Sequence, residues 1–230
     1  MGGWVFAPRV LPTLAYVVLL VLLISLGLWQ LDRAEQKHQA LAERAAASRA
    51  PVVDLNDTPT RLASHEYRRA RGSGRFDASR QFLLDNRIQD GQVGYRLLTP
   101  LRLAGQDRAV LVDRGFVPIV GNRQTLPELP PVPPDAEVAG RIRRGPSVGI
   151  RLGEPADNAG EWPRRVQYLD FDYMAEELGY PIADYLLIEG PHSHDPVVRR
   201  SGRDAWSLGP GPQAGYAVQW VSVAAALTVI

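Results

Sequence analysis

Two histidines and a carboxylate lie together late in the sequence, and their types and spacing come nearest to a metal site. The stretch His192-Ser-His194-Asp195 lies between two prolines. In an extended segment, side chains two residues apart point the same way, so His192 and His194 could share a divalent ion. A strong metal site needs a second set of ligands, which this cluster lacks. The loop is therefore a weak metal candidate, and an exposed polar loop is the simpler interpretation.

The other common sequence signatures of catalysis or ligand binding are absent or weak in this sequence. No Gly-rich loop follows a strand and opens a helix, so nucleotide binding has no support. The acidic pair Glu176-Glu177 falls on a short predicted helix and is most simply solvated. We therefore expect that the protein is not an enzyme. The alternative is a membrane-anchored periplasmic enzyme or metal-binding protein that uses the His192/His194 loop.

An uncharged run near the N-terminus is the strongest structural signal in the sequence. No charged side chain lies between Arg9 and Asp32. The run 10–31 is long enough to cross a hydrocarbon layer of ~30 Å at ~1.5 Å per helical residue. A cleaved signal peptide would have a shorter apolar core, and Trp29 and Arg33 suit a membrane–water boundary. We predict a first transmembrane helix at 10–31.

The residues that follow this span predict a helical stalk. The segment 32–50 is rich in Ala, Glu, Gln, Lys and Arg, which favour helix, and Pro51 then ends the pattern. A solvated position on the stalk is the simplest role for His38.

A second uncharged run follows Asp204, the last charged residue. Its segment 214–230 is at the short limit for a membrane span. Tyr216 and Trp220 lie four residues apart, hence on one face, near the entry to the bilayer. We predict a second transmembrane helix with its lead-in at 205–230. Because the sequence stops without a polar flank, we expect this helix to be truncated at its C-terminal end. A terminal amphipathic helix packed on the domain is the alternative.

The residues between the two runs, 51–204, are enough for one compact domain with a core. The net charge of the chain is +1, which gives no electrostatic case for nucleic-acid binding. The absence of cysteine excludes disulfides and thiolate copper or zinc sites. Short segments rich in β-branched and aromatic residues predict strands: Tyr67–Phe76, Gln81–Asn86, Gly94–Leu103, Ala109–Pro118, Val138–Arg144 and Tyr185–Ile188. The expected fold class is a membrane protein with two transmembrane helices flanking a β-rich α+β extramembrane domain.

Three local patterns refine the prediction for this domain. Asp170 is placed to cap a helix at 171–178, and Gly179 stands at its C′ position. The proline-rich segment 126–135 must be extended, since so many prolines can hold neither a ladder nor a helix. In the strand AVLVDRGFVP, we expect Gly115 to mark a bulge or close backbone approach, with the following Phe in the core.

Six motifs, taken in order and spacing, resemble the Surfeit locus protein 1 family. They cover the sequence from about Gly27 to Ile230 and are specific as a set: GLWQLDR (27–33), RRARGSGRF (68–76), Gly94-Tyr95 with Thr99-Pro100-Leu101, VLVDRGFVP (110–118), Trp162 with VQYLD (166–170), and GYAVQW (215–220). The resemblance implies an assembly factor for a haem–copper terminal oxidase (cytochrome c oxidase biogenesis), which assists haem a insertion into the catalytic subunit. It implies a multi-pass protein of the bacterial inner membrane with its domain on the periplasmic side.

The same resemblance implies partners and a cofactor. The partners are the catalytic subunit of the oxidase and haem a synthase, and haem a is a transient cofactor; the apolar spans add membrane lipid. From the residue types and their places at the membrane surface, we expect the contacts to haem or a partner at Trp29, Arg33, Gln213, Tyr216 and Trp220. The aromatic rings could shield an apolar macrocycle while Arg33 meets a haem propionate. In the alternative interpretation, these rings only anchor the helices at the membrane interface.

One position departs from the family pattern. The family often has a histidine three residues before the Tyr of the second-span motif, where this sequence has Gln213. An amide oxygen is a poor ligand for haem iron compared with imidazole. An axial ligand would therefore come from elsewhere in the chain, with His38 as one substitute, or from the partner.

Overall fold

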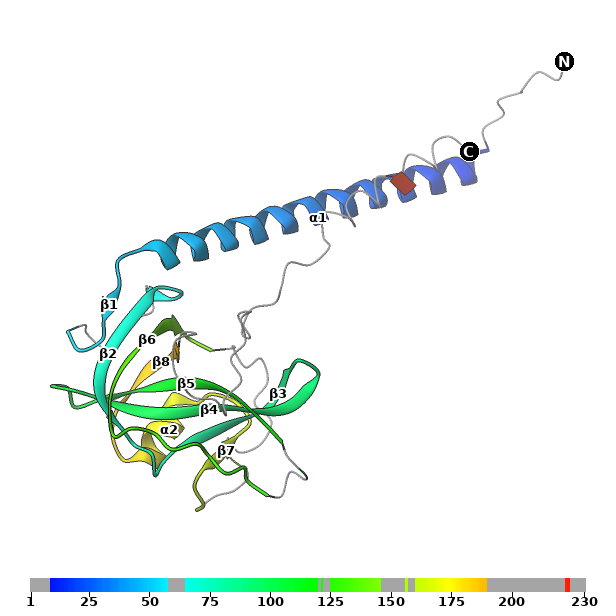
Figure 1. The fold of residues 1–230 in the computed structure, drawn as a ribbon. Helices are drawn as coiled ribbons and strands as arrows, with labels where there is room; N and C mark the ends of the chain where they lie inside the picture. Colours follow the sequence, from blue (N-terminus) through cyan, green and yellow to red (C-terminus); the bar gives the residue numbers. More distant parts are fainter. Residues whose placement is uncertain are drawn as a thin grey trace. The chain divides into compact units, whose positions relative to one another are not determined.

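The computed structural model describes residues 9–57, 65–119, 121, 125–145, 156, 160–189 and 222–223 (Figure 1). The chain divides into two compact units. One comprises residues 1–44 and 208–230, and the other comprises residues 45–207. Helix α1 (Val10–Arg49) supplies most of the described residues of the first unit, while all strands and helix α2 (Phe171–Leu178) belong to the second.

Helix α1 runs without a break through 40 residues and ends just before Pro51. It therefore covers both the span predicted at 10–31 and the stalk predicted at 32–50. Within the described residues, α1 is the one helix long and apolar enough to cross a membrane. Leu11 and Leu14 are 80% and 61% exposed, which suits a surface that meets lipid. Of the second span predicted at 205–230, the described residues include only Ser222 and Val223, both helical.

The domain is organised around a closed ring of five strands (Figure 1). In ring order these are β2 (Arg69–Phe76), β6 (Asp135–Arg143), β8 (Ile182–Glu189), β5 (Ala109–Pro118) and β4 (Gln92–Leu103), after which β4 pairs with β2. The β5–β8 pairing is parallel and the others are antiparallel. Because the sheet closes on itself, most of the ring has no free edge.

Strand β4 makes the closure possible because two strands share one of its edges. Its first half pairs with β3 (Phe82–Gln89), and residues 101–103 pair with β2. Pro100 lies at the changeover, where neither ladder includes it, so its missing N–H is tolerated. Its carbonyl oxygen instead accepts a hydrogen bond from the Asp77 amide at 2.9 Å. Two short parallel strands complete the sheet, β7 (Arg164–Val166) beside β3 and β1 (Val53–Asp54) beside the start of β2.

Alternation along the strands divides the core into an inside and an outside layer. Val110 and Val112 of β5 join the cluster within the ring, together with Tyr185 of β8. Leu111 points the other way and packs in the cluster that includes α2. The two-residue period of a strand explains why the two valines share one face and Leu111 takes the other. The Tyr185 hydroxyl is buried and has no hydrogen-bond partner among the described residues, and burial raises its pKa to about 12.

Helix α2 begins and ends where the sequence predicted. The Asp170 side chain accepts a hydrogen bond from the Tyr173 amide at 3.1 Å. Gly179 has a left-handed backbone (φ 73°), and its N–H bonds the carbonyls of Ala175 and Glu176. The proline-rich segment forms no ladder from 126 to 134, as predicted, although Asp135 already begins β6. Leu126 and Leu129 of this segment cover a third cluster of buried side chains.

Most of the predicted strands differ from the structure at one or both ends, and β6 begins at Asp135, three residues earlier than expected. β2 begins at Arg69 rather than Tyr67, because Tyr67 has a positive φ of 68° that a strand cannot hold. β3 continues past Asn86 to Gln89. Its register is irregular around Asn86, which has a positive φ. β8 begins at 182, three residues earlier than expected. Strands β1 and β7 were not predicted, because two or three residues are too few to show the alternation typical of a strand.

Two glycines allow neighbouring strands to approach closely in the ring. A Cβ atom on Gly74 of β2 would lie 2.0 Å from the Arg102 carbonyl oxygen of β4. On Gly140 of β6 it would lie 2.1 Å from the Ile188 oxygen of β8. A backbone atom cannot move aside as a side chain can, so these positions require glycine.

Replacing Gly74 by alanine should destabilise the domain by about 1–3 kcal/mol, because the methyl group meets backbone at the point of closure. Thermal unfolding of the full chain in detergent, followed by circular dichroism, measures this. Gly72→Ala is the matched control: its Cβ would meet only side-chain atoms of Leu103 and Leu55, at 3.2 Å. Equal losses for the two variants would contradict this account of the closure.

Candidate functional site

The predicted membrane boundary of α1 carries an aromatic ring and a cation on one face. Trp29 is 57% exposed, and Arg33 follows one turn later. Arg33 Nη1 donates to Gln36 Oε1 at 3.1 Å, and Gln36 Nε2 donates to Asp32 Oδ2 at 2.9 Å. These bonds hold the Arg33 side chain along the helix surface. The pair can present an apolar ring and a charged donor to one amphiphilic group.

The remaining predicted site residues are not brought to this face by the described structure. His38 lies nine residues beyond Trp29, about 900° around the helix, which places it on the opposite face of α1. It therefore cannot supply an axial ligand to a group held over Trp29 and Arg33. The predicted residues Gln213, Tyr216, Trp220, His192 and His194 lie outside the described residues. Among the residues that are described, no group of three or more His, Asp or Glu side chains could hold a metal ion.

A buried ion pair joins β4 and β5 inside the domain. Arg96 Nη2 lies 2.7 Å from Asp113 Oδ2, and Arg96 Nε donates to both carboxylate oxygens at 3.0 and 2.9 Å. The side chains are 7% and 0% exposed. This bidentate geometry compensates for part of the cost of burying two charges. Burial, and then the charge of Arg96, lower the pKa of the neighbouring Arg87 guanidinium.

The same carboxylate shapes a bulge in β5. Asp113 Oδ1 also accepts the Gly115 amide at 3.0 Å, across one intervening residue. Opposite this point the register shifts, so that Arg114 is the extra residue of the strand. Gly115 takes a φ of 131°, and Phe116 is 1% exposed. The predictions of a bulge at Gly115 and a core position for Phe116 are confirmed.

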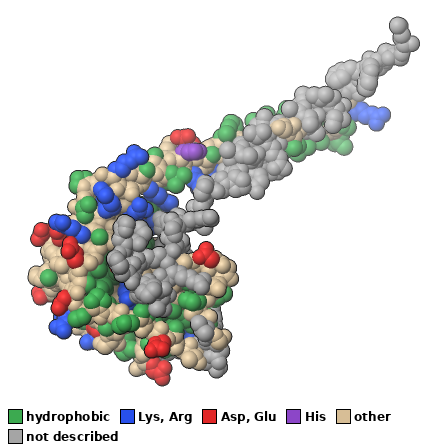
Figure 2. Space-filling view, in the orientation of Figure 1, with side chains coloured by type: hydrophobic (Ala, Val, Ile, Leu, Met, Phe, Trp, Pro, Cys, Tyr) green, Lys and Arg blue, Asp and Glu red, His purple; other side chains and the backbone are tan. Residues whose placement is uncertain are grey.

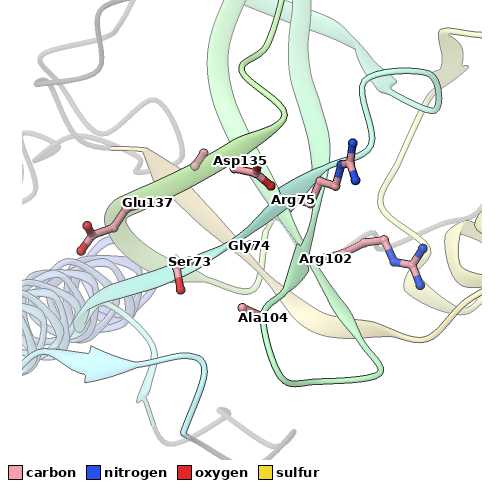
Figure 3. A pocket seen from close by; sticks show the side chains of 8 residues that line it. Ser73, Gly74, Arg75, Arg102, Ala104, Asp135 and Glu137 are labelled. Atoms are coloured by element: carbon pink, nitrogen blue, oxygen red, sulfur yellow. The ribbon is translucent and has the colours of Figure 1, made fainter.

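A hollow of about 530 Å³ lies where β2, β4 and β6 meet (Figure 3). Gly74 lies at its centre; Arg75 and Arg102 extend to one side and Glu137 to the other. Arg102 is anchored by its position 4.9 Å over the Tyr180 ring. The rim is exposed and carries charges of both signs, and no buried polar side chain lines the hollow. It is a surface concavity rather than a catalytic centre.

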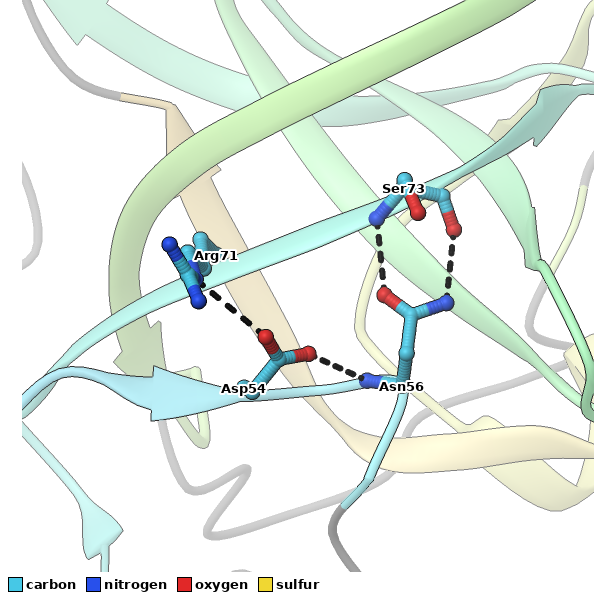
Figure 4. A network of polar contacts seen from close by, with 4 residues as sticks. All are labelled: Asp54, Asn56, Arg71 and Ser73. Atoms are coloured by element: carbon cyan, nitrogen blue, oxygen red, sulfur yellow. Dashed lines mark hydrogen bonds and ion pairs between the residues drawn. The ribbon is translucent and has the colours of Figure 1, made fainter.

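The residues just after β1 are attached to the ring by the side-chain amide of Asn56 (Figure 4). Asn56 Oδ1 accepts the Ser73 amide at 2.8 Å, and Asn56 Nδ2 donates to the Ser73 and Ala104 carbonyls, both at 2.9 Å. The side chain thus makes the pair of bonds that a backbone group of a neighbouring strand would make. The Asp54 carboxylate supports this arrangement. It accepts hydrogen bonds from the backbone N–H of Asn56 at 3.1 Å and from Arg71 Nε at 3.2 Å.

The comparison with known families decides the identity of the chain. The model of the SURF1 family matches residues 17–225, which include most of α1 and all the strands of the domain. The chain belongs to the SURF1 family. The resemblance predicted from the sequence is confirmed.

Curated members of the SURF1 family show how far the similarity extends. Surfeit locus protein 1 of Xenopus tropicalis is 28% identical over 229 residues, covering 90% of this chain and 70% of that protein. A SURF1-like protein of Rickettsia felis is 31% identical over 105 residues, 45% of each chain. A SURF1-like protein of Monosiga brevicollis is 32% identical over 108 residues, 43% of this chain and 41% of that protein. The chain thus spans less than half the length of the last two relatives.

The family motifs fall on elements with distinct roles in the structure. The first motif forms the part of α1 in which Gly27 is buried and Trp29 is exposed, whereas the motif at 110–118 forms β5 with its bulge. The motif at 68–76 forms β2, whose outward positions carry arginines. Our sequence reasoning missed the partner that β2 finds in β6.

Replacing Asp113 by leucine should lower the free energy of unfolding by about 3–5 kcal/mol, because Arg96 would remain buried without its counter-ion. The double variant Arg96→Met/Asp113→Leu should recover most of this loss. Asp54→Asn is the control, since its partner Arg71 has a side chain 61% exposed and such pairs contribute about 1 kcal/mol or less. Chemical denaturation of the purified chain distinguishes these outcomes, and a mild effect of Asp113→Leu alone would refute the role given to the pair.

Proposed function

We propose that this protein is an assembly factor for a haem–copper terminal oxidase, and that it assists the insertion of haem a into the catalytic subunit. Membership of the SURF1 family is the observation that carries this proposal. The oxidase subunit is then its main partner and haem a synthase a further one. The chain itself performs no catalytic step in this proposal; it holds and positions other molecules.

The proposed site is the exposed face of α1 around Trp29 and Arg33. An indole ring offers an apolar plane, and a guanidinium offers paired donors to a propionate carboxylate. This is the chemistry that haem a presents at a membrane surface. Its iron would need an axial ligand from another element or from the partner, because His38 lies on the opposite face. Gln213, Tyr216 and Trp220 stay proposed contacts.

The proposal also gives the chain a location. Helix α1 is long and apolar enough to anchor it in a membrane. We propose the bacterial inner membrane, with both termini in the cytoplasm and the β-rich domain in the periplasm. Reporter fusions within the domain and at both termini test this topology. A cytoplasmic domain would overturn the location and remove the basis for periplasmic contact with the oxidase.

Deleting the protein should lower the haem a band in reduced-minus-oxidised spectra of membranes while the catalytic subunit, measured by immunoblot, is still made. Wild-type protein and His38→Ala should restore the band, since His38 points away from the proposed site. Arg33→Gln should restore it only in part, because the propionate partner is lost. Gln213→His and Gln213→Ala test the remaining position. An unchanged spectrum in the deletion strain would refute the proposed function.

A further inference from the structure

Two arginine-rich runs lie side by side at one end of the domain. β2 enters through Arg68-Arg69-Ala70-Arg71, and β6 leaves through Arg141-Ile142-Arg143-Arg144. The antiparallel register places Arg69 directly opposite Arg141. The pairing continues beyond the strands, where the Ile142 amide bonds the Arg68 carbonyl at 3.0 Å. Figure 2 shows Lys and Arg side chains gathered at this end of the domain, where β1 and β2 begin.

These arginines fall into two groups with different surroundings. Two of them support the fold: Arg68 Nη2 donates to the Pro51 carbonyl at 2.7 Å, and the buried Arg143 lies 4.5 Å over the Tyr67 ring. The other group points outward and is exposed; we call it the arginine surface, and it comprises Arg69, Arg71, Arg141 and Arg144.

The arginine surface has almost no internal counter-charge. Arg71 meets Asp54 at 3.2 Å. The guanidinium groups of Arg69, Arg141 and Arg144 have no carboxylate partner among the described residues. Like charges at directly opposite positions of adjacent strands destabilise a sheet. The Arg69–Arg141 pair therefore works against the stability of the domain, which is the expected trade-off at a surface that binds something.

The chemistry of the surface indicates its occupant. Lys37 is the one lysine of the sequence, so every cation here is a planar guanidinium, which binds carboxylates and phosphates through two parallel hydrogen bonds. Alternate side chains of an extended protein segment recur about every 7 Å, as do alternate positions on a strand, so an acidic segment matches the spacing of these guanidinium groups.

We propose that the arginine surface is a docking surface for an acidic segment of a partner protein, whose carboxylates pair with Arg69 and Arg141. Adjacent strands lie about 4.8 Å apart and alternate residues on one strand about 7 Å apart. The surface therefore fits an extended segment with two or more carboxylates on one side. This inference concerns the domain alone, and it holds or fails independently of any role in haem insertion.

The test uses the full chain in nanodiscs of neutral lipid and a fluorescent peptide of alternating Glu and Ser. The peptide should bind, a Gln-Ser peptide should not, and salt should weaken the complex. Arg69→Gln/Arg141→Gln should weaken binding about tenfold or more while its melting temperature stays equal or rises, since the repulsive pair is gone. If that variant melts at a lower temperature than the wild type, the binding measurement is repeated with Arg144→Gln, because Arg144 lies outside the strands.

The matched control removes two positive charges outside the β-rich domain with Arg9→Gln/Lys37→Gln, and should bind within about twofold of the wild type. Equal binding by the arginine variant and the wild type would overturn the proposal. So would an equal loss in the control, which would show an effect of net charge alone. If vesicles with phosphatidylglycerol bind in an Arg69- and Arg141-dependent way and the peptide does not, the surface belongs to lipid and the proposal is wrong.

Discussion

The short ladder between β2 and β4 is the contact on which the rest of the domain depends. It comprises only residues 74–76 and 101–103, yet it converts a row of strands into a closed ring. Gly74 allows the two backbones to approach, and Pro100 marks the place where β4 exchanges one neighbour for another. Closure also fixes the path of β2, and with it the positions of β1 and of the arginine surface.

Arginine has three physically different roles in this domain. Arg96 is buried with a carboxylate, where desolvation makes an exact counter-charge necessary. Arg102, Arg143 and Arg164 lie over the rings of Tyr180, Tyr67 and Trp162, and Arg164 also pairs with Glu177. The third role is that of the exposed pair Arg69 and Arg141, which among the described residues have neither a carboxylate partner nor an aromatic ring beneath them.

Local patterns predicted the parts of the fold that local forces determine. The alternation in β5, the cap and Gly179 of α2 and the bulge at Gly115 each depend on a few neighbouring residues. Other features depend on residues far apart in the sequence: ring closure, the attachment of β1 and the pairing of the two arginine-rich runs. Hydrophobic periodicity does not reveal such contacts. In the candidate site, the boundary residues Trp29 and Arg33 were predictable from hydropathy. The face of α1 on which His38 lies could be assigned only once the helix was known to run without a break from Trp29 to His38.

The amide of Asn56 has a consequence for the ageing of the protein. Hydrolysis of that side chain to a carboxylate would remove both N–H donors and set negative charge against the carbonyl oxygens of Ser73 and Ala104. Asp54 stands close by and would add repulsion. One slow chemical change, with no change in the core, would thus loosen the strand through which α1 is joined to the ring.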